Sequence, residues 1–478
     1  MRGKKLLFLT IVLLIAAVLA LRAAQHQRVL QEEALYRDAH VFVGDNAYPK
    51  DADFLDLRGS GITTGHFEAL RALLPDCEIL WDVPFQGALY PSDIESITIT
   101  ALTDADVVQL DYLTALQTVD ATNCDDYAQL MALKERRKGL TITYRVVLSG
   151  EKRPMDTDSL TLTDADPEEL TERLRYLPAL KQVHFIQPEM APDALLALQE
   201  SYPDIRFTWE KDVLGIPFRE DVTELDFSGT ILENTRELEY LMGYFPKLEK
   251  LVLCDCGLDN ETLADYRQRV RSQYKVVWSI QIQTLTIRTD ETTFMPVKHD
   301  IYVNDTHLTE LKYCEDMICI DVGHMGITNI DWVWYMPHLQ FLTLADTDVA
   351  DIEAIGSLKE LVYLELFKTQ VSDYSPLVGC TALEDVNMAF TYGDAAVFAR
   401  MPWLNNLWVN QCGVDAETRQ LLEESLPDTH IEFDSGWHLG GSWRGVRNYF
   451  RMRDILEMPY YDWGNQVGRP GDPGYPYD

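Results

Sequence analysis

The chain has 478 residues, of which 77 are acidic and 41 are basic, so its formal net charge at pH 7 is −36. This surplus of acid argues against nucleic acid as a partner, because binding to phosphate depends on neutralisation by basic side chains. It also disfavours adsorption on an anionic membrane or wall polymer, whereas it favours solubility and attraction to cationic ligands.

The N-terminus joins a basic flank, MRGKK, to the apolar run LLFLTIVLLIAAVLAL of residues 6–21. A basic flank before an apolar run directs a chain to export and leaves the basic end inside. The run is shorter than the roughly 20 residues that usually span a bilayer. We predict that residues 1–24 form an uncleaved signal anchor, with a cleaved signal peptide and secretion as the alternative. Residues 25–50 then form a polar stalk, and the rest lies outside the cytoplasm.

Residues 51–282 repeat at about 64 residues, and each unit contains short stretches of period-two alternation. Such alternation indicates a strand with one buried face. The signatures are SITIT (96–100), SLTLT (159–163) and ELDFS (224–228), followed in step by TITYRV (141–146), IRFTWEKDV (205–213) and YKVVWSI (274–280). Between strands the chain carries helix signals, several of which close on Pro-Asp, where a helix must stop. Each unit is therefore predicted to hold three solenoid turns.

Acidic motifs recur in register within these units. The sequence TDAD occurs at Thr103–Asp106 and at Thr163–Asp166, and further on Asp346, Asp348 and Asp351 form a cluster. Carboxylate clusters can hold calcium. Their recurrence in register favours instead a role as helix or turn caps, in which side-chain oxygens accept backbone N–H bonds.

The eight cysteines show no disulfide framework. Cys124, Cys256 and Cys412 occupy a bend position that Ser or Thr holds in sister turns, so we interpret them as small buried residues rather than bridge partners. An exported chain with buried free cysteines indicates an organism that does not depend on disulfides, in keeping with a bacterial source.

Four consecutive blocks of 22, 22, 22 and 21 residues align from Glu315 to Met401. A period this short and regular means that one supersecondary unit is stacked on copies of itself. Each block has an apolar-x-apolar core and then a small polar residue, as in Leu342, Leu344 and Thr347. We expect the hydroxyl at this bend to satisfy buried backbone groups that would be costly if left unpaired.

This frame resembles the leucine-rich repeat, and its 22-residue spacing resembles the internalin-like bacterial subfamily. The usual Asn at the bend is replaced by Thr, Met, Ser or Cys. The resemblance implies an α/β solenoid, a right-handed stack with a parallel sheet on its concave face, with the short repeats over residues 311–433. It also implies interaction as the class of activity. Residues 283–310 fit the frame poorly and are interpreted as an irregular joint between the two repeat sets.

Residues 434–478 are predicted to be a C-terminal cap followed by a mobile tail. The cap would seal the exposed core of the last repeat, and its aromatic residues are Trp437, Trp443, Tyr449 and Phe450. The alternative is an aromatic ligand patch, to which charge is added by Arg444, Arg447, Arg451 and Arg453. The last residues, 461–478, have too little aliphatic content to pack.

No metal-protease motif, phosphate loop, nucleophile elbow or paired-cysteine zinc motif occurs, so we predict a non-enzymatic protein without cofactor or metal. His324 and His338 lie 14 residues apart in neighbouring turns, where stacking could bring them together. No third ligand is evident, and we interpret them as ordinary surface histidines.

The candidate binding site is therefore the outward side of the stacked strands. The spacing predicts three columns: Asp321, Thr343, Glu365, Asn387 and Trp408; Gly323, Ala345, Phe367, Ala389 and Asn410; and His324, Asp346, Lys368, Phe390 and Gln411. If exposed together, Phe367, Phe390 and Trp408 would form the apolar patch with polar neighbours that is typical of a protein-binding hot spot. The alternative is that the C-terminal tail covers one or more of them.

We select nine of these positions as ligand-binding residues: Asp321, Thr343, Glu365, Phe367, Lys368, Asn387, Phe390, Trp408 and Asn410. The leading hypothesis is a membrane-anchored, extracytoplasmic repeat protein that binds a protein or cell-surface ligand through its concave sheet. The second is a passive cell-envelope scaffold, and the third is an enzyme that uses residues 283–310 or the tail.

Overall fold

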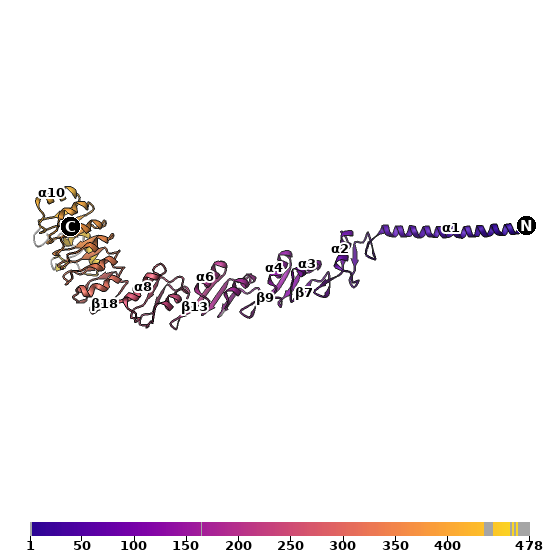
Figure 1. Ribbon diagram of the computed structural model, residues 1–478, viewed down its shortest axis with the longest axis horizontal. Helices are drawn as coiled ribbons and strands as arrows, with labels where there is room; N and C mark the ends of the chain where they lie inside the picture. Colours follow the sequence, from indigo (N-terminus) through magenta and orange to yellow (C-terminus); the bar gives the residue numbers. More distant parts are fainter. Residues whose placement is uncertain (1, 164, 435–442, 459–460, 463–464, 467–478) are drawn as a thin grey trace. The chain divides into compact units, whose positions relative to one another are not determined.

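The computed structural model describes residues 2–163, 165–434, 443–458, 461–462 and 465–466 (Figure 1). The chain divides into two compact units, Met1–Glu210 and Lys211–Asp478. Trp437 and most of the predicted mobile tail lie outside the described residues, and of that tail only the short hairpin of β27 (Tyr461–Asp462) and β28 (Asn465–Gln466) is described.

The first unit begins with a single long helix, α1 (Arg2–Ala39). Its segment Leu7–Ala39 is long and apolar enough to cross a membrane, a test that a signal sequence near an N-terminus also passes. Every side chain of this segment is exposed. The apolar half of α1 thus has no protein core around it in the described chain.

The rest of the first unit consists of parallel strands, helices on the return path, and a hairpin at the end of each repeat. The strands β7, β8 and β9 pair in parallel, as do β11, β12 and β13 and the pair β3 and β4. They lie where the period-two pattern predicted. The strands are β1 (His40–Val43), β2 (Asn46–Pro49), β3 (Phe54–Asp56), β4 (Glu78–Leu80), β5 (Asp82–Phe85), β6 (Ala88–Pro91), β7 (Ser96–Thr98), β8 (Thr118–Ala121), β9 (Thr141–Leu148), β10 (Glu151–Pro154), β11 (Ser159–Leu162), β12 (Gln182–Ile186) and β13 (Arg206–Val213).

Three helices of this unit begin at a residue whose side chain caps them: Thr63, Thr103 and Asp166. The Thr103 hydroxyl accepts from the backbone N–H of Asp106, whose carboxylate accepts from the N–H of Thr103, so the first TDAD motif forms a capping box. In the second motif Asp166 accepts from the N–H of Glu168. The capping interpretation is thus confirmed for both. The helices are α2 (Thr64–Leu73), α3 (Asp104–Gln109), η1 (Leu110–Tyr112), α4 (Tyr127–Arg136), α5 (Pro167–Arg173), η2 (Leu174–Tyr176) and α6 (Pro192–Ser201).

The second unit opens with a further long repeat, in which three parallel strands are followed by a hairpin. Its elements are β14 (Ile216–Arg219), β15 (Glu224–Asp226), α7 (Arg236–Met242), β16 (Lys250–Val252), α8 (Asn260–Val270), β17 (Lys275–Val277), β18 (Ser279–Ile282) and β19 (Leu285–Arg288).

A seven-stranded parallel sheet follows, in the order of the chain. Its strands are β20 (Thr293–Phe294), β21 (Cys319–Asp321), β22 (Phe341–Thr343), β23 (Tyr363–Glu365), β24 (Asp385–Asn387), β25 (Asn406–Trp408) and β26 (His430–Glu432). The return segments are η3 (Pro296–His299), α9 (Asp305–Leu308), η4 (Thr309–Tyr313), η5 (Asp331–Tyr335), η6 (Glu353–Ser357), η7 (Ser375–Gly379), η8 (Ala395–Arg400) and α10 (Ala416–Ser425). Such a stack of strand-and-return repeats is a solenoid.

Residues 283–310, which the sequence predicts to be an irregular joint, contain two strands of the fold. Within this stretch β19 completes a hairpin with β18, and β20 is the first strand of the seven-stranded sheet. The sequence signal is weak here because β20 has only two residues and its neighbour is a hairpin rather than a helix.

Each short repeat bends in the same way after its strand. His324, Asp346, Lys368, Phe390 and Gln411 all have a φ between 53° and 62°, and their backbone N–H groups up to Phe390 donate to the following repeat. The predicted bend hydroxyls act as expected, since those of Thr347, Thr369 and Thr391 donate to the carbonyls three residues earlier. All eight cysteines are free, and those in bend positions are buried, as predicted.

Candidate functional site

The strand register aligns the outward side chains of the sheet into columns. Asp321, Thr343, Glu365, Asn387 and Trp408 are direct neighbours across β21 to β25, as the spacing predicted. A second outward column, two residues earlier, contains Cys319, Phe341, Tyr363, Asp385 and Asn406. The core lies on the opposite side of the strands, where the alternate residues are buried. We call these two columns, with Ala389 and Asn410, the outer sheet face.

The outer sheet face is covered, and the prediction of an exposed aromatic patch is wrong. Trp408, Asn387 and Asn410 are 0% exposed and Thr343 is 5% exposed. Asp321, Glu365, Phe367 and Phe390 are half-buried, so that of the nine selected residues only Lys368 is exposed. The role of these residues in binding stays a prediction.

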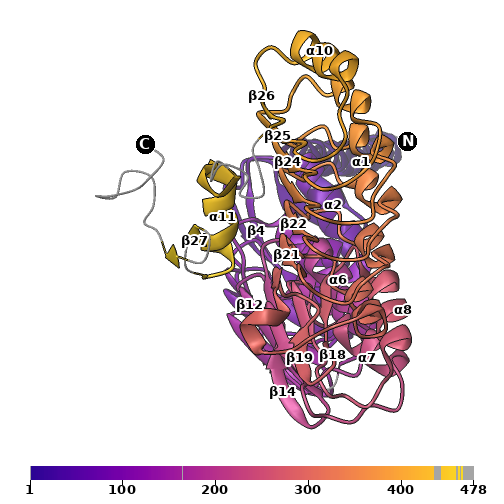
Figure 2. The ribbon, with the colours of Figure 1, turned by 90° about the vertical axis from the view of Figure 1, so that its left-hand side faces the viewer.

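The cover is a segment of the same chain, residues 443–458, which we call the strap. Its helix α11 (Arg447–Ile455) lies on one side of the strands, and the helical return segments lie on the other (Figure 2). The aromatic residues of the strap therefore pack on the outer sheet face rather than sealing the last repeat beyond β26, which corrects the predicted cap. The physical reason is that the exposed strand faces carry large aromatic rings that gain by burial.

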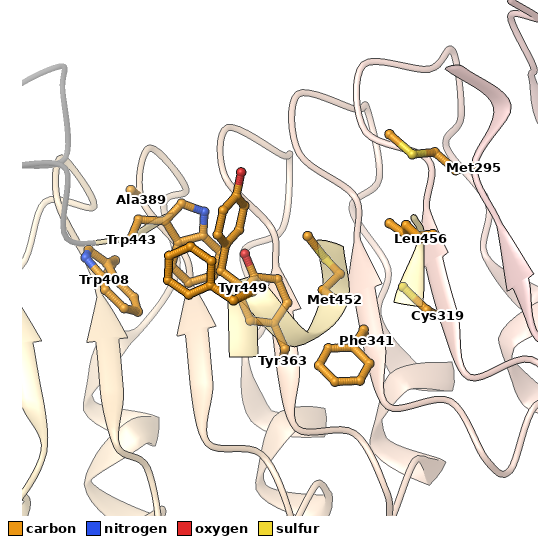
Figure 3. Close-up of a cluster of buried hydrophobic side chains, with 11 residues drawn as sticks. Met295, Cys319, Phe341, Tyr363, Ala389, Trp408, Trp443, Tyr449, Met452 and Leu456 are labelled. Atoms are coloured by element: carbon orange, nitrogen blue, oxygen red, sulfur yellow. The ribbon is translucent and has the colours of Figure 1, made fainter. Parts of the chain in front are cut away.

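Aromatic contacts hold the strap at its first residue. The indole of Trp443 stacks on Tyr363 with a centroid distance of 4.8 Å and meets Trp408 edge-on at 4.6 Å (Figure 3). Both interactions have the geometry that aromatic pairs prefer. The buried cluster around them comprises Met295, Cys319, Phe341, Tyr363, Ala389, Trp408, Trp443, Tyr449, Phe450, Met452 and Leu456.

Polar contacts fix the register of the strap on the strands. The Nδ2 group of Asn448, which is 2% exposed, donates to Glu384 at 2.8 Å and to Asp385 at 2.9 Å. The hydroxyl of Thr343 donates to the sulfur of Met452 at 3.5 Å. At the far end the Nζ group of Lys298 donates to the carbonyl of Leu456. Sequence reasoning missed these contacts, because nothing local to Asn448 or Lys298 indicates a partner so far along the chain.

Charges on the two sides are complementary. Burial raises the pKa of Glu365 to about 7, while the nearby Arg444 of the strap acts to lower it. Burial likewise raises the pKa of Asp321, which Arg453 opposes first among the nearby charges. The pKa of Asp385 is raised by burial as well, against the hydrogen bonds from Asn406 and Asn448. The strap thus brings arginines to carboxylates that burial has made costly to ionise.

Two polar atoms beneath the strap are left without a protein partner among the described residues. They are the hydroxyl of Tyr363 and the Nδ2 group of Asn387, both fully buried. An unsatisfied buried polar group costs about 1–3 kcal/mol. The strap therefore complements the outer sheet face in shape and charge but not at these two atoms.

The third predicted column lies at the bends, where His324, Lys368 and Gln411 are exposed and Phe390 is half-buried against the buried cluster. Asp346 pairs with Lys368 at 2.7 Å and with the Nδ1 atom of His324 at 3.1 Å. His338 pairs with Glu360 at 3.0 Å. The two histidines thus pair with acids and not with each other. In the described part of the chain no group of three or more His, Cys, Asp or Glu residues is placed to hold a metal ion.

The parallel strands recur at spacings of 21 to 26 residues, with a buried aliphatic ladder and, in three consecutive turns, a hydroxyl bonded at the bend. These features define a leucine-rich repeat architecture. No protein-family model matches the chain, and no curated protein matches it.

Solved structures with some similarity include two internalins and a leucine-rich repeat protein. An internalin of Listeria monocytogenes is 13% identical, with 77% of this chain and 94% of that chain covered and a TM-score of 0.27. Internalin C2 of Listeria monocytogenes is 13% identical, with coverages of 47% and 87% and a TM-score of 0.25. A leucine-rich repeat protein of Leptospira interrogans is 12% identical, with coverages of 74% and 95% and a TM-score of 0.25. At these TM-scores the assignment of the repeat architecture rests on the chain's own strand register.

Proposed function

We propose that this chain is a leucine-rich repeat protein that binds a polypeptide partner through the outer sheet face, the concave side of a right-handed solenoid. The observation that supports the proposal is the strap itself, because the face already holds a polypeptide segment of 16 residues. A buried tryptophan, a buried asparagine and complementary charges are what a protein-binding hot spot contains. The nine residues selected from the sequence belong to this face or border it.

The proposal places the binding region outside the cytoplasm, with α1 as an uncleaved membrane anchor. The exposed apolar side chains of Leu7 to Leu21 support a membrane environment. Mass spectrometry of the N-terminus of the mature chain tests this. An intact residue 2 in the carbonate-washed membrane fraction is expected, whereas a soluble chain that begins near residue 21 would show a cleaved signal.

The alternative is a passive cell-envelope scaffold. A scaffold needs no complementary face, and its outward columns are expected to be polar and featureless. The buried cluster of aromatic rings on this face favours binding instead. For the third hypothesis, an enzyme, no group of three or more His, Cys, Asp or Glu residues in the described part of the chain is placed to hold a catalytic metal ion.

A peptide-binding experiment tests the proposed function. The receptor is the full chain carrying Trp443→Ala and Asn448→Ala, which removes the stacking and hydrogen-bond contacts of its own strap. The probe is a fluorescent synthetic peptide of residues 443–458. Saturable binding by fluorescence anisotropy is expected, and a matched peptide with the same two alanines should bind at least about tenfold more weakly. If the folded receptor fails to distinguish the two peptides, the proposal is wrong.

A further inference from the structure

We infer that the strap is a built-in competitor, and that the partner of the outer sheet face is a helical segment of the same chemistry that binds by displacing it. This inference rests on the proposed function and adds the class of partner and the regulation of the site. The partner segment presents an aromatic anchor and arginines, as the strap does with Trp443 and Arg444 just before α11 and Arg453 within it.

The chemistry of the partner follows from what the strap contacts. Tyr363 and Trp408 form the two walls that Trp443 fills, so the partner needs one large aromatic side chain at that point. Asp321 and Glu365 flank Thr343 in the strand register, and Thr343 contacts Met452 of the strap, which precedes Arg453. Arg453 and Arg444 act to lower the raised pKa values of these two carboxyls, so cationic side chains suit this part of the face. The chain has a net charge of −36, so a basic segment is also drawn to it from a distance.

The inference of displacement follows from two buried polar atoms to which the strap offers no hydrogen-bond partner. The buried hydroxyl of Tyr363 and the buried Nδ2 group of Asn387 have no protein partner among the described residues. A partner segment with a side-chain oxygen at each of these atoms recovers the free energy lost by leaving them unpaired. This gain allows the partner to compete with the strap, although the strap has the high effective concentration of a tethered segment. We therefore expect the partner to resemble the strap in its aromatic and basic residues and to differ from it by these two acceptors.

A tethered competitor lowers the apparent affinity of the free partner by the fraction of chains in which the face is open. The strap-weakened chain, Trp443→Ala with Asn448→Ala, should therefore bind the labelled peptide of residues 443–458 at least about tenfold more tightly than the unaltered chain. Circular dichroism melting of both chains verifies that each is folded. Gel filtration with light scattering verifies that the unaltered chain is a monomer.

A second variant keeps the strap in place. Thr343 and Met452 touch through their side chains, so cysteines are placed at both positions (Thr343→Cys with Met452→Cys), and mass spectrometry verifies that oxidation cross-links them. In the oxidised chain peptide binding should be lost, and reduction should restore it. The matched control is Thr381→Cys with Met452→Cys, since Thr381 is exposed and lies off the outer sheet face.

The outcomes separate the two proposals. If the strap-weakened chain binds the peptide and the unaltered and cross-linked chains bind it equally well, competition by the strap is wrong while the binding function stands. If no variant binds the peptide, the proposed function fails, and the inference fails with it. A dimer of the unaltered chain that the peptide dissociates would assign the face to the strap of a second copy and overturn a separate partner.

Discussion

Trp443 and Tyr363 are 80 residues apart in the sequence, and their rings stack at a centroid distance of 4.8 Å and an interplanar angle of 22°. This pair joins the start of the strap to the middle of the seven-stranded sheet. Trp443 is 3% exposed, and the ring of Trp408 closes its other side. The outer sheet face is thus buried by the strap, a segment that lies outside the repeats of the solenoid.

Replacing Trp443 by alanine should destabilise the second unit. The change removes a buried indole and opens the face to water, which typically costs about 3–5 kcal/mol for a tryptophan in a core. Urea unfolding followed by circular dichroism measures the free energy of unfolding. The matched control is Trp334→Ala, because Trp334 is 49% exposed and its loss should change stability by less than about 0.5 kcal/mol. Equal effects of the two changes would show that the strap contributes no stability.

Two buried tyrosines should respond in opposite directions to loss of the hydroxyl. The hydroxyl of Tyr363 has no protein partner among the described residues, so Tyr363→Phe should raise the free energy of unfolding by about 1 kcal/mol. The hydroxyl of Tyr374 bonds to Thr391 at 2.5 Å and accepts from the N–H of Gly393 at 2.8 Å. Tyr374→Phe should therefore lower the free energy of unfolding by about 1–3 kcal/mol. Thermal melts of the two variants test the pair, and a loss of stability in both would mean that Tyr363 has a partner.

Stability should fall with rising pH because of Glu365. Burial raises the pKa of this carboxyl from 4.5 to about 7, so the native state holds its proton more tightly than the unfolded chain. The stabilisation is complete below pH 4.5 and is lost as the pH rises through 7, by as much as about 3 kcal/mol. The raised pKa values of Asp321 and Asp385 act in the same direction.

The measurement is the free energy of unfolding from pH 4.5 to 8 for the unaltered chain and for Glu365→Gln, whose amide cannot ionise. The difference between the two should shift steadily in favour of Glu365→Gln as the pH rises. A difference that is flat across this range would mean that Glu365 titrates as an exposed carboxyl. Glu360→Gln is the control, since Glu360 is exposed.

The return segments should tolerate no side chain at Gly379. A Cβ atom there would collide with the backbone carbonyl oxygen of Gly356 in the preceding repeat. Gly379→Ala should therefore cost about 1–3 kcal/mol, because stacked repeats cannot separate without breaking neighbouring contacts. Gly139→Ala is the control, with open space around its Cβ position. Differential scanning calorimetry compares the two, and identical midpoints would show that the repeats can shift apart.

The repeats could be predicted because each one is defined by residues and contacts that are close together in the sequence. Leu342, Leu364 and Val386 recur at the same point in each block, and Thr347, Thr369 and Thr391 supply a bend hydroxyl that bonds within three residues. Contacts this short in sequence are encoded by spacing alone. The column that contains Asn387 and Trp408 followed from the same spacing, because parallel neighbours lie one repeat apart.

Local sequence patterns did not predict contacts between segments that are far apart in the sequence or hidden by a break in the repeat. At residues 283–310 the frame is hidden by a hairpin and a two-residue strand, so only the pairing of β20 with β21 reveals the first turn of the sheet. The strap posed the larger difficulty. Its aromatic and arginine content was visible, but the residues that it covers are more than 30 positions away, and the strap itself belongs to no repeat.

The sequence by itself determined the repeat architecture, the positions of most strands, the caps in the two TDAD motifs and the outward column that contains Asn387 and Trp408. All of these depend on periodic spacing and on contacts within a turn or between adjacent turns. Only the tertiary structure decided that the outer sheet face is covered. That outcome depends on the complementarity of two surfaces, with Trp443 against Tyr363 and Asn448 against Asp385. Such a contact is made once and is not repeated, so no period in the sequence encodes it.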